Sequence, residues 1–128
     1  MAESPNAPYS PRVLEQFQNG RNGGELPDAN VRVRAENPAC GDILELALKV
    51  EGERIVNAKF RARGCVAAIA CAAQLVDLIR GRTLAEAGAL KCAELVAALG
   101  GLPHASSHAS HLAMDALAAA LKTLPYGK

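Results

Sequence analysis

The chain reads Asn37-Pro38-Ala39-Cys40-Gly41-Asp42 at the point where its most regular alternating segment, Ile43 to Val50, begins. A thiol and a carboxylate therefore stand two positions apart, separated by a glycine that permits a tight bend. Both groups are ligands for soft or borderline metal ions. We interpret this segment as a pair of ligands on a turn at one end of a β-sheet.

A second cysteine, Cys65, follows the next alternating segment in the sequence Arg63-Gly64-Cys65. The intervening Glu51-Gly52-Glu53 predicts a hairpin turn between the two segments. In a hairpin the start of the first strand lies beside the end of the second. Cys40 and Cys65 are therefore expected at the same end of the sheet, where they would form one site.

The periodicity of the chain predicts an α+β fold, a three-stranded antiparallel sheet with helices packed on one face. In the third strand the alternation assigns Val56, Ala58 and Phe60 to the covered face. In the first helix, capped by Ser10, it assigns Val13, Leu14 and Phe17 to the buried face. The expected strands are 31–36, 43–50 and 56–63, and the expected helices follow Ser10-Pro11, then cover 66–80, a short segment after Thr83, 91–99, and a last segment from Ser106 or Ser107 to about Thr123.

The length of 128 residues fits one domain, which we place at 9–128 after a flexible tail at 1–8. A polar, glycine-rich loop from Gln18 to Asn30 is expected before the first strand. The segment 66–80 is apolar around most of its circumference, so we expect it to be the central buried helix, ended by Gly81.

Charge and hydropathy exclude several classes of function. Fourteen basic residues against thirteen acidic ones leave a net charge of +1 with no long run of either sign, so a nucleic-acid partner is not expected. The longest apolar run, Cys65 to Ile79, is interrupted by Gln74 and Asp77 and is too short to span a bilayer. The start of the chain resembles no secretory signal, and we expect a soluble cytoplasmic protein without a membrane partner.

Four cysteines in such a protein are expected to be reduced, which favours metal binding over a disulfide framework. Asp42 alternates with Leu44 and so faces the helices, where a carboxylate needs a partner. Cys65 stands at the start of a helix, where the helix dipole favours an anion. The alternative interpretation is that Cys40 and Cys65 are two small buried cysteines at a sheet end, because free cysteine is often buried. Cys71 and Cys92 are interpreted as small core residues.

Three histidines, His104, His108 and His111, lie near the start of the last helix. Pro103 places His104 before that helix, so a site made of all three is not expected. His108 falls in the first turn and could reach the sheet end, and the alternative is a solvated surface histidine. The chain lacks a phosphate-binding glycine loop, a Gly-x-Ser-x-Gly elbow and a Cys-x-x-Cys pair. An enzyme is not predicted.

Motifs spread over nearly the whole chain resemble those of the IscU/NifU N-terminal family of iron–sulfur cluster assembly scaffolds. None is diagnostic alone, but they occur in order and at nearly the family spacing. They are Tyr9-Ser10, Arg21-Asn22, Pro38-Ala39-Cys40-Gly41-Asp42, Ala58-Lys59-Phe60, Gly64-Cys65, Ala68-Ile69-Ala70, Gly81-Arg82-Thr83-Leu84, Leu102-Pro103, His108-x-Ser110 and Leu112-Ala113-x-Asp115-Ala116.

The resemblance implies a scaffold that receives sulfur from a cysteine desulfurase, holds a labile [2Fe-2S] cluster or iron, and passes it to apo iron–sulfur proteins. It also implies that zinc can occupy the same site. Four family positions match Cys40, Asp42, Cys65 and His108 in this sequence.

The third cysteine of the family is absent. Alignment on Leu102-Pro103 places Ala109 at its position, and a one-residue slip would place His108 there with Ser107 at the histidine position. Two thiolates, one imidazole and one carboxylate still supply four donors, enough for zinc or for a mixed-ligand [2Fe-2S] cluster. Neither Cys71 nor Cys92 occupies the missing position.

Other departures concern the partners. The segment 102–106, Leu-Pro-His-Ala-Ser, lacks the second proline and the lysine of the family's chaperone-recognition segment, which argues against dependence on a dedicated Hsp70. Gln16 and Gly20 replace a histidine and a proline. Two other functions stay open, a zinc-bound sulfur-transfer partner of a desulfurase and a degenerate, metal-free regulator of one.

Overall fold

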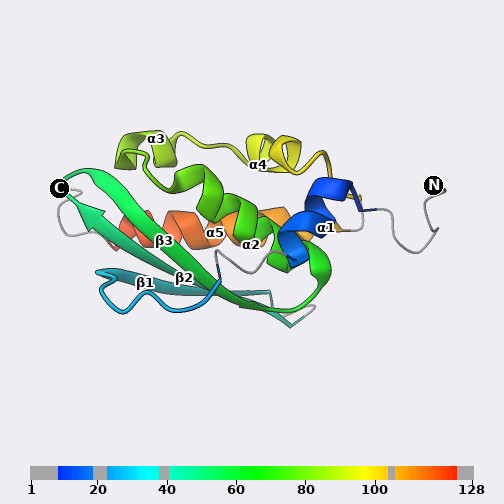
Figure 1. The fold of residues 1–128 in the computed structure, drawn as a ribbon, viewed down its shortest axis with the longest axis horizontal. Helices are drawn as coiled ribbons and strands as arrows, with labels where there is room; N and C mark the ends of the chain where they lie inside the picture. The colour runs from blue at the N-terminus through cyan, green and yellow to red at the C-terminus, as the bar shows by residue number, and fades with distance from the viewer. Residues whose placement is uncertain (1–8, 19–22, 38–40, 104–105, 124–128) are drawn as a thin grey trace.

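The computed structural model describes residues 9–18, 23–37, 41–103 and 106–123. One helix precedes three strands, and four helices follow them (Figure 1). This arrangement confirms the predicted α+β class. The elements are α1 (Pro11–Gln18), β1 (Val31–Asn37), β2 (Asp42–Glu51), β3 (Arg54–Arg63), α2 (Val66–Ile79), α3 (Leu84–Gly88), α4 (Cys92–Ala98) and α5 (Ser107–Lys122).

The three strands form one antiparallel sheet with β2 in the centre. Gly52, with φ of 60°, lies in the predicted hairpin turn between β2 and β3. Asn37 pairs with Asp42, and Ile43 pairs with Arg63. The end of β1, the start of β2 and the end of β3 therefore meet at one end of the sheet.

The two faces of the sheet differ in chemistry because successive side chains of a strand point to opposite faces. Apolar side chains cover the inner face, and charged ones dominate the outer face. Buried inner-face residues are Val31, Leu44, Leu46, Leu48, Val50, Ala58 and Phe60.

The prediction that Val56 faces the core is wrong. The pairing of β2 with β3 shifts between Lys49 and Val50: Lys49 pairs with Asn57, whereas Val50 pairs with Ile55. Val56 is thus the extra residue of a β-bulge, which changes the face to which the neighbouring side chains point. Ile55 is fully buried, and Val56 is 40% exposed.

The inner face of the sheet is covered by α2 and α5, and α3 and α4 lie beyond these two helices (Figure 1). As predicted, α2 is the central helix: it is buried around most of its circumference and ends just before Gly81, which has φ of 86°. Its alanines allow close approach to its neighbours. One hydrophobic cluster joins the sheet to the helices.

The buried face of α1 differs from the prediction. Val13 is buried, but Gln16 is the second inward residue, while Leu14 and Phe17 are exposed. The reason is a polar contact with α2, since Gln16 Nε2 donates to Gln74 Oε1 at 2.9 Å. The same nitrogen donates to Asp77 Oδ2 at 2.8 Å, so the amide N–H groups are satisfied where they are buried.

The predicted caps form in part. Ser10 Oγ accepts from Val13 N at 3.1 Å at the start of α1. Thr83 and Glu86 make a reciprocal capping box at α3, and the hydrogen bond from the Thr83 backbone lowers the pKa of Glu86. Ser106 occupies the N-cap of α5 without a side-chain cap hydrogen bond.

Some predictions fall outside the described residues: the tail at 1–8, the ligand Cys40, and His104. The division into a tail and one domain stays a prediction. Of the described helices, none is long and apolar enough to cross a membrane.

The bulge gives a paired test of the fold. We expect Ile55→Ala to lower the free energy of unfolding by about 2–4 kcal/mol, because it leaves a cavity in the core. Val56→Ala should change it by no more than about 0.5 kcal/mol, as is usual for surface positions. Urea unfolding of both variants measures the difference. Equal losses, or a larger loss for Val56→Ala, would contradict the observed register.

Candidate metal centre

Three potential metal ligands converge at the sheet end where β2 starts and β3 finishes. Asp42 is the first residue of β2, Cys65 is the N-cap of α2 directly after β3, and His108 lies in the first turn of α5. One ligand atom from each residue lies within 4.8 Å of the others. Across the described ranges, these three form the only such group of cysteine, histidine and carboxylate side chains.

The distances between the donor atoms are short. His108 Nε2 lies 3.4 Å from Asp42 Oδ2, and Cys65 Sγ lies 3.6 Å from the same oxygen. The sulfur lies 4.0 Å from His108 Nε2. A thiol, an imidazole and a carboxylate therefore surround one small volume.

The Asp42 side chain is only 3% exposed and is held from two sides. The backbone N–H of Cys65 donates to Oδ1 at 3.2 Å, while Oδ2 faces His108 and the Cys65 sulfur. The partners that a carboxylate on the covered face needs are therefore the Cys65 backbone at the start of α2 and the His108 imidazole on α5.

Gly64 makes this arrangement possible. A Cβ at this position would lie 2.1 Å from Asp42 Oδ1 and 2.7 Å from its Cγ, and its φ of 145° is one that other residues rarely adopt. The sequence suggested only a sharp turn here. The close approach to a carboxylate 22 positions earlier in the chain could not be predicted, because it depends on how the strands pair.

His108 is the half-exposed member of the group, with 36% of its side chain accessible. The next two residues of α5, Ala109 and Ser110, are buried instead. The group is therefore anchored in the core through Asp42 and open to solvent beside the imidazole. Ser107 is exposed.

The other two described cysteines lie outside this group. Cys71 is fully buried in α2, as predicted, and burial, with smaller contributions from the thiols of Cys65 and Cys92, raises the pKa of Cys71 to about 12. It therefore stays a neutral thiol, a poor ligand and nucleophile, at ordinary pH. Cys92 is half-buried, with Sγ 3.2 Å from Ser110 Oγ, so its assignment to the core was only partly right.

The remaining predicted residues divide as follows. His111 is exposed on α5. Cys40, the fourth predicted donor, lies outside the described residues, as does His104.

The fold and this group of donors define a small α+β protein in which a thiol, an imidazole and a carboxylate lie together at one end of the sheet. The model of the family described as NifU-like N terminal domain matches residues 8–127. The chain therefore belongs to this family, as the motifs indicated.

Named relatives support the same assignment. The chain is 41% identical over 113 residues to iron-sulfur cluster assembly scaffold protein IscU 1 of Archaeoglobus fulgidus, covering 88% of this chain and 74% of that one. It is 39% identical over 117 residues to the IscU scaffold protein of Haemophilus influenzae, covering 88% and 92%. It is 40% identical over 121 residues to the iron-sulfur cluster assembly enzyme IscU of Drosophila melanogaster, covering 91% and 78%.

Solved structures confirm the fold. The N-terminal part of a NifU-like protein from Brucella abortus superposes with a TM-score of 0.72 at 18% identity, covering 88% of this chain and 91% of that one. A SUF-system scaffold candidate from Fervidobacterium islandicum gives 0.72 at 22% identity, covering 88% and 96%.

We expect Gly64→Ala to destabilise the protein more than Gly24→Ala does. Gly24 also has a positive φ, 118°, but a Cβ there would meet nothing within 4 Å. Backbone strain alone should cost about 1–3 kcal/mol at either position. The clash with Asp42 should add about 1–3 kcal/mol at Gly64. Urea unfolding of both variants measures the difference.

A double variant isolates that contact. In an Asp42→Ala background the two atoms nearest the new Cβ are gone, so Gly64→Ala should then cost about as much as Gly24→Ala. The same excess cost in both backgrounds would show that the close approach to Asp42 is not the cause.

Cys71 should resist alkylation in the folded protein. At pH 8 we expect iodoacetamide to modify Cys65 first and Cys71 only after unfolding, because a buried thiol with a raised pKa offers no thiolate. Peptide mapping of folded and urea-unfolded samples measures both sites. Modification of both at equal rates in the folded state would contradict the observed burial.

Proposed function

We propose that this protein is an iron–sulfur cluster assembly scaffold, which receives sulfur from a cysteine desulfurase and holds a labile [2Fe-2S] cluster for transfer to apo-proteins. The convergence of Asp42, Cys65 and His108 at one sheet end carries the proposal. Membership of the NifU-like family, and relatives named as scaffold proteins, support it. The proposal assigns no catalytic residue.

The donors suffice in number without the third family cysteine. Each iron of a [2Fe-2S] cluster takes two protein ligands beside the bridging sulfides, and histidine is known to replace cysteine in such clusters. Asp42, Cys65 and His108, with Cys40 as the fourth donor, would fill these four positions. Replacing a thiolate by a carboxylate leaves a cluster that is held less tightly, which suits cargo intended for transfer.

A bound zinc ion is the second candidate cargo, favoured by a specific observation. Tetrahedral zinc with ordinary bond lengths places its ligand atoms about 3.3–3.6 Å apart. The observed separations of 3.4, 3.6 and 4.0 Å are close to this range. A zinc-bound partner in sulfur transfer would use the same side chains.

Anoxic reconstitution separates the two. Metal-stripped protein is incubated with ferrous iron, cysteine, a cysteine desulfurase and dithiothreitol. Reducing two persulfide sulfurs to sulfide takes four electrons, of which the oxidation of two ferrous ions to ferric supplies two and dithiothreitol supplies two. We expect about two iron and two acid-labile sulfides per chain, with visible charge-transfer bands, as a [2Fe-2S] cluster requires.

Variants of the donors identify the ligands. Cys65→Ala should abolish sulfide binding. His108→Ala should speed the loss of iron to a chelator by more than about 10-fold. Removing a residue that only hydrogen-bonds to a metal ligand already costs about 10-fold or more, and His108 would be a ligand itself. Cys71→Ala and Cys92→Ser serve as matched thiol controls and should behave like the parent. Full sulfide content in Cys65→Ala would contradict the scaffold assignment, and one tight zinc without sulfide would favour the second candidate.

A further inference from the structure

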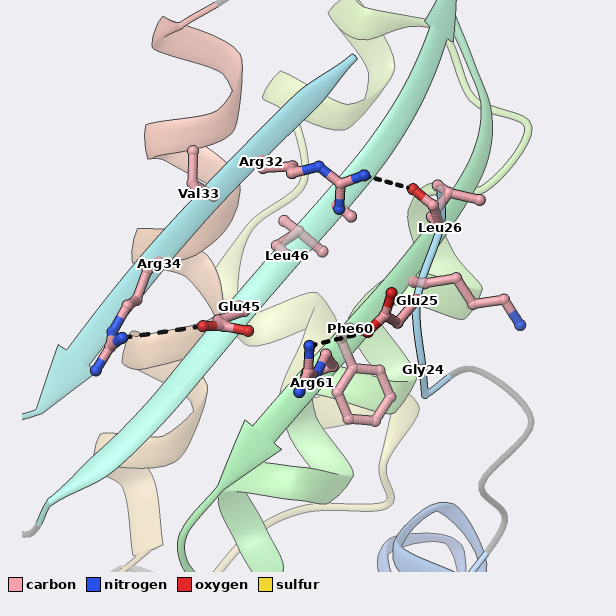
Figure 2. Close-up of a pocket in the computed structure, with 12 residues that line it drawn as sticks. Gly24, Glu25, Leu26, Arg32, Val33, Arg34, Glu45, Leu46, Phe60 and Arg61 are labelled. Carbon is pink, nitrogen blue, oxygen red and sulfur yellow. Dashed lines mark hydrogen bonds and ion pairs between the residues drawn. The ribbon is translucent and has the colours of Figure 1, made fainter. Parts of the chain in front are cut away.

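The outer face of the sheet carries a trough that the metal centre does not use. Two hollows of about 350 Å³ and 270 Å³ lie in line along β2 and share the row formed by Arg34, Glu45 and Arg61. The first hollow is lined by Ala47, the smallest outward side chain of β2, and the second by Ile43. Figure 2 shows the first hollow with its charged residues.

The strand register explains the walls of the trough. On the β1 side Arg32 pairs with Ala47, and Arg34 pairs with Glu45. On the β3 side the same β2 positions are flanked by Lys59 and Arg61, with Arg63 beside Ile43. Cations therefore stand on both sides of a floor about 10 Å wide, which is twice the spacing of neighbouring strands.

The charge of the trough is concentrated. Five cationic and two acidic side chains line the two hollows, an excess of three positive charges, whereas the whole chain carries +1. Arg61 contacts Glu25 at 3.3 Å, and Arg34 contacts Glu36 at 2.8 Å and Glu45 at 3.9 Å, all on the surface. Exposed ion pairs contribute little, about 0–1 kcal/mol, so a partner's carboxylates can displace them.

The position of the trough is defined at both ends. The segment that includes Glu25 and Leu26 crosses the sheet at one end, where the Leu26 carbonyl accepts from Arg32 Nη2 at 2.8 Å (Figure 2). At the other end Ile43 directly follows Asp42, and Arg63 directly precedes Gly64. The trough thus leads along the sheet to the metal centre on the inner face.

From this geometry we propose that the trough, lined by Arg32, Arg34, Lys59, Arg61 and Arg63, docks an extended acidic segment of a partner protein. The cations at alternate positions of β3 repeat every ~6.6–6.8 Å. Alternate side chains of any extended chain have the same spacing. Acidic residues at every second position of a peptide would match this repeat. A partner bound there would be held by complementary charge near the sheet end that carries Asp42.

Nucleic acid fits less well. Among the described residues, Phe60 is the only aromatic one that lines the hollows, and its ring belongs to the hydrophobic core. The trough therefore offers no aromatic platform for stacking bases.

A synthetic peptide with four Thr-Glu repeats, labelled with fluorescein, provides the probe. We expect fluorescence anisotropy to show binding to the purified parent protein that weakens with added salt. The corresponding Thr-Lys peptide should not bind. A single-stranded DNA oligonucleotide or tripolyphosphate that binds more tightly than the Thr-Glu peptide would overturn the assignment to a protein segment.

Two kinds of variant test the trough itself. Arg61→Glu/Arg63→Glu should weaken binding by about tenfold or more. Arg82→Glu/Lys122→Glu makes the same change of net charge outside the trough, in the connection between α2 and α3 and at the end of α5, and should stay within about twofold. Ala47→Ile fills the floor without changing charge and suits a strand, so it should also weaken binding, by about fivefold or more. Thermal unfolding confirms that each variant is folded.

Absence of peptide binding to the parent would overturn the proposal. Equal losses in the two charge-reversal variants, or unchanged binding in Ala47→Ile, would also overturn it. Either result would mean that peptide binding depends only on the net charge of the protein. The experiment needs no iron, so its outcome is independent of the scaffold assignment.

Discussion

The structure depends on one buried carboxylate. Asp42 lies at the start of the central strand with its side chain almost fully enclosed, and an isolated charge in such a place would be very costly. The N–H of Cys65 and the imidazole of His108 are its partners. Because these groups come from β2, the β3–α2 junction and α5, satisfying one carboxylate fixes the relative positions of the elements that form the metal centre. Gly64 is required because nothing larger fits beside that carboxylate.

Much of this could be predicted from the sequence, since periodicity is local. Alternation located the strands, the apolar run located α2, and the positions of Asp42, Cys65 and His108 at strand and helix ends brought them to one site. Features that depend on how the strands pair or how the helices contact one another could not be predicted. The bulge that exposes Val56 arises from the register of the hairpin, and the inward turn of Gln16 arises from a hydrogen bond to Gln74. The contribution of Cys40 stays a prediction.

The sheet separates two kinds of chemistry. Its inner face is apolar and has the donor group at one end. Its outer face is charged, and the trough on it reaches the same end of the sheet. Alternation of side chains along β2 produces both, because Asp42 and Leu44 point inward while Ile43, Glu45 and Ala47 point outward. A partner held on the outer face and a cargo held on the inner side of the sheet end can therefore be neighbours without competing for the same residues.

The central claim is that a mixed set of thiolate, imidazole and carboxylate ligands replaces the three-cysteine set. Iron X-ray absorption of the reconstituted protein tests it most directly, because the fine structure distinguishes sulfur from nitrogen and oxygen neighbours. We expect a shell of nitrogen or oxygen beside the sulfur shell, diminished in His108→Ala and unchanged in Cys92→Ser. A shell of sulfur alone in the parent protein would contradict the account, since it would mean that another thiol completes the site.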